Sequence, residues 1–283
     1  MIHKPTVNHI FDEKFKHGLE LGLPANLSFL DPYMDDIELA HFTIGGDRLI
    51  LDGERIPYQD PLLEVEVESV GDPVGGARQV REVGPPLVQT TDSDRPVWGA
   101  EGLETGPGFL LWGKEAAKEF TLRMPPTSTN PPCTLFLTLS TDDLAEYFAL
   151  GVVNDGIKTL FQIFLNRSGT PGDFGFSYRL DGGEGGFFTA GMSHPVDEKF
   201  VLCMRKSAST MDVFINGALE RSVAGYTSSG TSSPPEYDIP VLGRNVNGTI
   251  SGVVNGTFNG GLFILSDLTD EEIASLSAAL EDL

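Results

Sequence analysis

Three glutamates in the first quarter of the chain have a spacing that could support chemistry. Glu64, Glu66 and Glu68 alternate with apolar residues, a pattern that favours a β-strand carrying all three carboxylates on one face. Two carboxylates about 5 Å apart can act as nucleophile and acid/base in retaining glycoside hydrolysis. A solvated edge strand explains the same alternation, because charge on an edge prevents unwanted strand pairing. We favour the edge strand and assign no catalytic residue.

Other catalytic arrangements are not evident. No Ser-His-Asp pattern stands out, and the His-Glu-x-x-His spacing that typically binds zinc is absent. The five histidines are scattered along the chain, at His3, His9, His17, His41 and His194. Cys133 and Cys203 lie far apart inside apolar runs, so we expect two buried free thiols and no disulfide framework. The sequence therefore predicts a protein that is not an enzyme.

A calcium site is the one metal site that the residue types permit. Calcium prefers hard oxygen ligands, and six aspartates lie in expected loops: Asp92, Asp94, Asp142, Asp143, Asp173 and Asp181. No run matches an EF-hand, and aspartates in turns usually stabilise the turn itself. We therefore expect no obligatory cofactor and leave calcium as an open alternative.

Four residues are candidates for binding a glycan, which needs an aromatic surface beside polar side chains on a rigid scaffold. Tyr226 and Tyr237 flank a polar loop rich in serine, glycine and proline, and Asp173 and Tyr178 lie in a second segment with glycines and aromatics. The neighbouring phenylalanines are better explained as core residues that alternate with surface ones: Phe174, Phe176 and Phe188.

From Glu119 onward, short apolar runs alternate with turn residues at the spacing of an all-β sandwich. The expected strands are Phe120–Arg123, Cys133–Ser140, Tyr147–Val153, Thr159–Asn166, Gly175–Arg179, Gly186–Ala190, Lys199–Lys206, Ser209–Ile215, Tyr237–Leu242 and Phe258–Leu265. Asn216-Gly217, directly after the expected strand Ser209–Ile215, predicts a hairpin turn.

A helix should end the chain. Asp267 or Thr269 can cap its first turn, and the following glutamates suit the positive end of the helix dipole. An apolar stripe on this helix is expected to face the domain: Leu268, Ile273, Leu276 and Leu280.

These closing elements, taken in order, resemble the end of a concanavalin A-like (laminin G-like) jelly roll, and the resemblance covers about residues 85–283. The loop at Arg95-Pro96 is similar to the opening of many bacteriophage and bacterial laminin G-like proteins. Leu111-Trp112-Gly113 stands where that family often has Phe-Asp-Gly, which removes one carboxylate. The resemblance implies an all-β, concanavalin A-like jelly-roll sandwich with an N-terminal extension and a short C-terminal helix. It also implies a fold that in some members binds glycans and in laminarinase-type glucanases cleaves them.

The first 60 residues lie outside this resemblance, so we divide the chain into an N-terminal docking or adaptor segment, 1–60, and a jelly-roll domain, 61–283. An amphipathic helix from Asn8 to Leu21 and a hairpin around Asp52-Gly53 are expected in the first segment. The segment either docks onto another protein or packs as a terminal extension on the domain's own sheet.

Composition excludes several classes of function. The 283 residues carry a net charge of −22, which opposes binding to nucleic acid. No apolar run reaches the length of a membrane span, and the start of the chain does not read as a signal peptide.

We therefore expect a non-enzymatic bacteriophage virion protein, in a head decoration, head fibre or tail fibre, localised in the virion. Its partners would be other virion proteins, through the N-terminal segment, and a host-surface glycan. A homo-oligomer fits this class, although no heptad repeat supports a coiled coil. The alternatives are a soluble bacterial carbohydrate-binding module and, less favoured, a laminarinase-type glycoside hydrolase.

Overall fold

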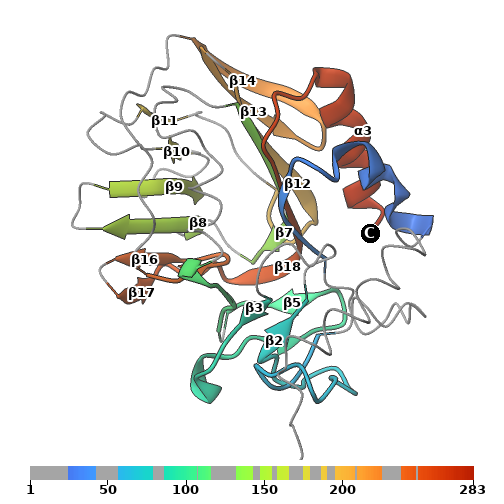
Figure 1. Cartoon of the computed structure of the whole chain (residues 1–283), viewed down its shortest axis with the longest axis vertical. Helices are drawn as coiled ribbons and strands as arrows, with labels where there is room; N and C mark the ends of the chain where they lie inside the picture. Colours follow the sequence, from blue (N-terminus) through green and yellow to red (C-terminus); the bar gives the residue numbers. More distant parts are fainter. Residues whose placement is uncertain are drawn as a thin grey trace, which may run out of the picture. The chain divides into compact units, whose positions relative to one another are not determined.

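The structure is a computed structural model of the whole chain (Figure 1). It describes residues 25–42, 57–78, 86–106, 108–115, 132–142, 147–154, 158–165, 175–178, 186–189, 195–207, 209–224, 237–246 and 248–283, and in some strands the backbone alone. The chain divides into two compact units, 1–36 and 37–283. The first contains a 3-10 helix, η1 (Ala25–Tyr33), in which Leu27 and Leu30 are buried.

The largest sheet, sheet A, has the strand order β14-β13-β12-β7-β18-β5-β4, with β1 as a further partner of β18. All its pairings are antiparallel. The strands are β1 (Ile37–Phe42), β4 (Val97–Trp98), β5 (Leu103–Glu104), β7 (Cys133–Thr141), β12 (Phe200–Lys206), β13 (Thr210–Ile215), β14 (Ala218–Ala224) and β18 (Gly256–Ile264).

A second sheet, sheet C, has the order β11-β10-β9-β8-β16-β17. Its strands are β8 (Tyr147–Asn154), β9 (Lys158–Leu165), β10 (Gly175–Tyr178), β11 (Gly186–Thr189), β16 (Arg244–Val246) and β17 (Thr249–Ser251). Only the β8–β16 pair is parallel among these described pairings. Sheets A and C make the two layers of a β-sandwich, so the predicted fold class is confirmed (Figure 1).

A small sheet, sheet B, is made of the segments around the opening loop. Its order is β15-β6-β3-β2, with β2 (Gly76–Ala77), β3 (Leu87–Val88), β6 (Leu111–Trp112) and β15 (Ile239–Pro240). The expected strand Tyr237–Leu242 is thus shortened to β15. Pro240 has no N–H to donate, and Leu242 has a left-handed φ of 57°, so a longer regular strand is disfavoured.

The remaining strand predictions from Cys133 onward agree with the structure to within a residue or two at each end. The expected strand Phe120–Arg123 lies outside the described residues. Asn216 and Gly217 form the predicted turn between β13 and β14, with φ of 48° and 78°. Asn216 also accepts a hydrogen bond of 2.7 Å from the Val201 N–H through its Oδ1, which fixes the turn to β12.

Both faces of sheet A are buried at its central strands β7 and β12, whereas β14 at its edge is largely exposed. On one face, Leu135, Leu137 and Leu139 of β7 join the main apolar core together with residues of sheet B. On the other face, Phe136 and its cross-strand neighbour Cys203 are fully buried beneath the C-terminal helix α3 (Asp270–Glu281). Every residue of Cys133–Leu139 is consequently buried, although only alternate side chains face the main core.

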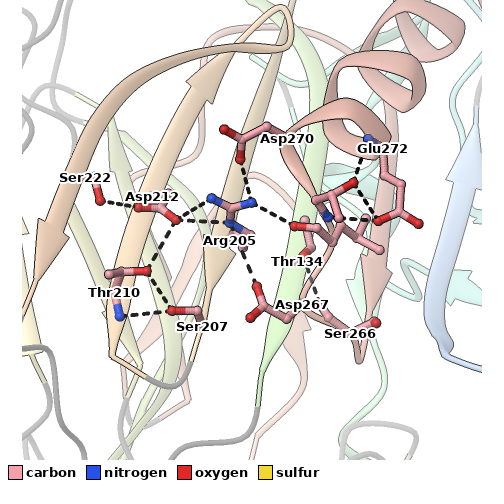
Figure 2. A network of polar contacts seen from close by, with 12 residues as sticks. Thr134, Arg205, Ser207, Thr210, Asp212, Ser222, Ser266, Asp267, Asp270 and Glu272 are labelled. Carbon is pink, nitrogen blue, oxygen red and sulfur yellow. Dashed lines mark hydrogen bonds and ion pairs between the residues drawn. The ribbon is translucent and has the colours of Figure 1, made fainter.

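Helix α3 begins as expected. Thr269 is its N-cap and forms a capping box with Glu272, in which each side chain accepts a hydrogen bond from the other residue's backbone N–H. The predicted apolar stripe is buried, at Leu268, Ile273, Leu276 and Leu280. A polar network at one edge of the same interface joins the sheet to the start of the helix, with Arg205 of β12 at its centre (Figure 2).

Strand β1 shows where one part of the first 60 residues lies. Ile37 lies opposite Ile264 and Phe42 opposite Gly260, so residues 37–42 belong to the domain's own sheet. For this part of the segment, the structure matches the second of the two interpretations, a terminal extension packed on the sheet. The expected helix and the hairpin around Asp52-Gly53 lie outside the described residues, and the docking role stays a prediction. No helix among the described residues is long and apolar enough to cross a membrane.

The predicted strand Leu63–Glu68 is wrong. The segment is a loop in which Glu64, Glu66 and Glu68 are all exposed, and it touches a strand partner only at the Tyr58–Glu66 bridge. The reason is local competition for hydrogen bonds. The Asp60 carboxylate accepts bonds from the backbone N–H groups of Glu64 and Val65, which a sheet would otherwise use.

Candidate functional site

Tyr237 is the predicted glycan-binding residue whose side chain the structure describes, and it lies at the end of sheet C. Its ring is partly exposed and rests against Gly248, in the turn between β16 and β17. A Cβ atom at position 248 would lie 3.3 Å from the ring's Cε1, and Gly248 has a φ of +88°. The close contact and the positive φ both favour glycine at position 248.

A buried asparagine holds both sides of this arrangement. The Asn245 side chain is 5% exposed; its Nδ2 donates to the Asp238 carbonyl at 2.9 Å and its Oδ1 accepts from the Gly248 N–H at 2.9 Å. The Asp238 carboxylate in turn accepts from the Lys114 N–H at 2.8 Å. The Asn245 side chain thus joins the segment that carries Tyr237 to the turn on which its ring rests. A recognition site requires this kind of rigidity.

Tyr178 ends strand β10 of the same sheet, and the register places it relative to Asn245. Ser177, Gln162, Gly151 and Arg244 lie opposite one another in a row across four strands. Tyr178 is the residue after Ser177, and Asn245 is the residue after Arg244. Because β10 and β16 run in the same direction, both residues lie on the same side of this row. Three strand spacings separate them, about 14 Å at the usual distance between neighbouring strands.

The other two predicted glycan-binding residues, Tyr226 and Asp173, lie outside the described residues. Sequence reasoning missed the two residues that position Tyr237, namely Asn245 and Gly248. The Asn247-Gly248 dipeptide was an available signal, because this pair favours a tight turn between strands. Nothing in the sequence indicated that the Asn245 side chain would link this turn to the segment that carries Tyr237.

The possible calcium ligands do not converge in the described part of the chain. There, no group of three or more His, Cys, Asp or Glu residues could hold a metal ion. Asp92 instead forms an ion pair with Arg95, with 2.6 Å between its Oδ1 and the arginine Nη2. Asp143, Asp173 and Asp181 lie outside the described residues.

Two buried groups on the core face of sheet A have shifted pKa values. Cys133 and Lys206 lie directly opposite each other on β7 and β12. Burial raises the pKa of the Cys133 thiol to about 11 and lowers the pKa of the Lys206 ammonium to about 8. Burial also raises the pKa of Cys203. Both cysteines are free and buried, as predicted, and protonated thiols are poor nucleophiles.

Comparisons with known proteins give a similarity of fold. No protein-family profile and no curated protein matches the chain. One similar solved structure is the CBM40 of the Ruminococcus gnavus IT-sialidase bound to α2,3-sialyllactose. It is 15% identical with a TM-score of 0.44, over 53% of this chain and 83% of that one.

Two further structures are similar at the same level. The heptameric SAP-like pentraxin from Limulus polyphemus is 12% identical with a TM-score of 0.35, over 53% of this chain and 72% of that one. The NanB sialidase from Streptococcus pneumoniae is 14% identical with a TM-score of 0.41, over 52% of this chain and 24% of that one. The similarity is to concanavalin A-like jelly-roll domains. At these identities and scores it carries no information about ligand or partner, and none of these structures links the chain to a bacteriophage.

Proposed function

We propose that this chain is a non-enzymatic carbohydrate-binding module that holds a glycan against Tyr237 at the end of sheet C. The observation that carries the proposal is the partly exposed Tyr237 ring, fixed against Gly248 by the Asn245 hydrogen bonds. A sugar ring has an apolar C–H face and a polar rim. A rigid aromatic side chain with a polar end can cover that face at small cost in conformational entropy.

The spacing along sheet C favours an oligosaccharide over a single sugar. Tyr178 ends its strand about 14 Å from Asn245, three strand spacings away. A chain of sugars that starts at Tyr237 and runs across the strands would reach this position. The loop 225–236 directly precedes Tyr237 and is rich in serine and glycine, residue types that supply adaptable hydrogen bonds in recognition loops.

Charge narrows the class of glycan to neutral ones. The net charge of −22 repels anionic ligands at long range. Asp238 lies beside Tyr237, and the backbone N–H of Lys114 engages one of its carboxylate oxygens, so a second carboxylate from a ligand would meet a negative site. We infer that uncharged oligosaccharides bind more tightly than sialylated or sulfated ones.

A glycan array followed by calorimetry tests this function. Wild-type protein should bind neutral oligosaccharides, Tyr237→Phe should retain binding, and Tyr237→Ala should lose it. Tyr33→Ala removes a partly exposed tyrosine from the other compact unit and should bind as wild type does. Absence of binding to any glycan, or equal loss in both alanine variants, contradicts the proposal.

A place on a bacteriophage particle is the second function that we propose. Its support is the resemblance of the Arg95-Pro96 loop to the opening of laminin G-like proteins of bacteriophages, together with the acidic, cysteine-poor composition. In that setting the protein would be localised in the virion, bound to other virion proteins through its N-terminal segment, and could be a homo-oligomer. Capsid, portal or tail genes next to its coding sequence would support this role, and neighbours of unrelated function would count against it.

A further inference from the structure

One loop exposes a concentration of apolar side chains that the folding of the domain does not explain. Among the described residues, four large apolar side chains are strongly exposed, and three of them lie within nine residues: Leu62 at 71%, Val65 at 51% and Val70 at 52%. Isolated exposed apolar residues are common, whereas grouped ones mark interaction sites. This group, Leu62, Val65 and Val70, is called the apolar loop below.

The loop's backbone is held by two carboxylates. Asp60 accepts hydrogen bonds from the N–H groups of Leu62, at 2.8 Å, and of Val65, at 2.7 Å. Asp72 accepts from the N–H groups of Glu68, at 2.8 Å, and of Ser69, at 3.0 Å. Because these bonds fix the backbone at both ends of the loop, its apolar side chains are presented in one arrangement before any partner arrives.

Two other side chains of the same segment point the opposite way and anchor it. Val67 is 5% exposed and belongs to the main core. Leu63 is 8% exposed, and its Cδ2 packs against Gly76 so closely that a Cβ atom at position 76 would require the leucine side chain to shift. Leu63 adopts a left-handed φ of 58°, which is unfavourable for leucine. The chain thus accepts backbone strain to bury Leu63 while Leu62 remains in water.

The charges within residues 56–77, the segment that carries the apolar loop, are of one sign, while Arg78, directly after it, lies over the Tyr58 ring with 5.1 Å between its Cζ and the ring centroid. Residues 56–77 contain five acidic residues and no lysine or arginine. Two of the acids, Asp60 and Asp72, bind the backbone, which leaves the exposed Glu64, Glu66 and Glu68 to face a partner. Charges at the rim of an interface select partners of opposite sign and speed their association.

We propose that the apolar loop is a docking surface for another protein, one that offers an apolar recess bordered by lysine or arginine. A second copy of this chain does not fit, because a symmetric contact would bring six glutamates together at one interface. An anionic membrane surface is repelled for the same reason. The surface is separate from the Tyr237 site: sheet B has β2, next to the loop, at one edge and β15, which follows Tyr237, at the other.

The experiment measures binding of a defined probe, a fluorescein-labelled amphipathic peptide of leucine and lysine, by fluorescence anisotropy. The triple variant Leu62→Ser, Val65→Ser, Val70→Ser keeps the net charge and should weaken binding about tenfold or more, since it removes the apolar area that the partner would bury. Leu219→Ser removes an equally exposed apolar residue on β14 and should change binding less than about twofold, as isolated surface substitutions do.

A second pair of variants tests the charges. Glu64→Gln, Glu66→Gln, Glu68→Gln should weaken binding and reduce its salt dependence. The matched set Glu101→Gln, Glu220→Gln, Glu281→Gln changes the net charge equally at exposed positions elsewhere and should leave binding near wild type. No saturable binding by wild type, or equal losses in the two sets, overturns the proposal. Sedimentation that shows a dimer dissociated by the serine substitutions overturns it in favour of self-association.

Discussion

Arg205 and Asp212 lie directly opposite each other on β12 and β13, and two guanidinium nitrogens of Arg205 bond one oxygen of Asp212, Nη2 at 2.7 Å and Nε at 3.0 Å. The pair extends into a row across four strands: Thr134 lies opposite Arg205 on β7, and Ser222 lies opposite Asp212 on β14 (Figure 2). From this row, Arg205 Nη1 reaches the Leu268 carbonyl and Asp270 at the start of α3. The arginine thereby joins the sheet to the helix.

Removing the buried carboxylate of this pair should be costly. Asp212 is 4% exposed, so Asp212→Asn leaves the Arg205 charge with only the outer carboxylates of Asp267 and Asp270. We expect a loss of about 3 kcal/mol in the free energy of unfolding, typical of breaking a buried ion pair. Asp270 is 59% exposed, and Asp270→Asn should cost less than about 1 kcal/mol. Urea unfolding measures both, and similar costs for the two variants would show that burial does not set the strength of this network.

The cap of α3 gives a smaller effect. The Thr269 hydroxyl accepts a hydrogen bond of 3.2 Å from the Glu272 N–H, so Thr269→Ala removes one half of the capping box. The expected loss of stability is about 1 kcal/mol. Ser275→Ala, at an exposed position in the same helix, is the control and should be neutral or slightly stabilising. Thermal unfolding checks both, and a control as destabilising as the cap variant would contradict this role for Thr269.

Lys206 makes the stability depend on pH in a defined direction. Burial lowers its pKa to about 8 from an ordinary value of 10.5, so between these values the unfolded chain binds a proton that the folded chain does not. Lys206 therefore contributes a stability that rises with pH in this window, and the cost of burying its charge is fully present below about pH 8. Cys133 has the opposite effect, because burial raises its pKa from an ordinary value of 9 to about 11. Its contribution to stability therefore falls as the pH rises between these two values.

A Lys206→Met variant separates the two effects, since Cys133 is present in both proteins. The unfolding free energy of the variant minus that of the wild type should fall by on the order of 2 kcal/mol between pH 8 and pH 10. Urea unfolding at several pH values supplies the difference. A difference that stays constant with pH would mean that Lys206 keeps an ordinary pKa in the folded protein.

The sequence patterns predicted most of sheets A and C, because those strands alternate or are continuously apolar over their whole length. The run Cys133–Ser140 was predicted within one residue of β7 for this reason. The same alternation misled at Leu63–Glu68, where the outcome was decided by Asp60, three residues before the run, and by Asp72, four residues after it. At the candidate site, Tyr237 was recognisable as an aromatic residue beside a polar loop. The hydrogen bonds of Asn245 were not, since they join segments through a turn whose geometry only the folded chain defines.

A substitution at Asp60 tests whether its carboxylate holds the backbone N–H groups of this loop. Asp60→Ala leaves the N–H groups of Leu62, Glu64 and Val65 without their acceptor and should destabilise the domain by about 1–3 kcal/mol. Glu64→Ala changes an exposed side chain that makes no hydrogen bond among those described, and this variant should lie within about 0.5 kcal/mol of wild type.

If Glu64→Gln, Glu66→Gln, Glu68→Gln abolished a measurable glycosidase activity, the non-enzymatic proposal would be wrong.

The last prediction links the turn at Gly248 to ligand binding. Gly248→Ala places a Cβ 3.3 Å from the Tyr237 ring and forces alanine into a φ of +88°, so the turn and the ring must move apart. We expect a loss of stability on the order of 1–2 kcal/mol, as for other left-handed positions. Glycan affinity should fall further than this loss explains, because the ring no longer rests on a fixed surface. Gly71→Ala is the matched control: it shares a positive φ, of +100°, but has open space where the added Cβ would lie, so it should lose stability and keep affinity. Calorimetric titration of both variants at a temperature where each is folded separates the effects, and unchanged affinity in Gly248→Ala would remove Tyr237 from the binding site.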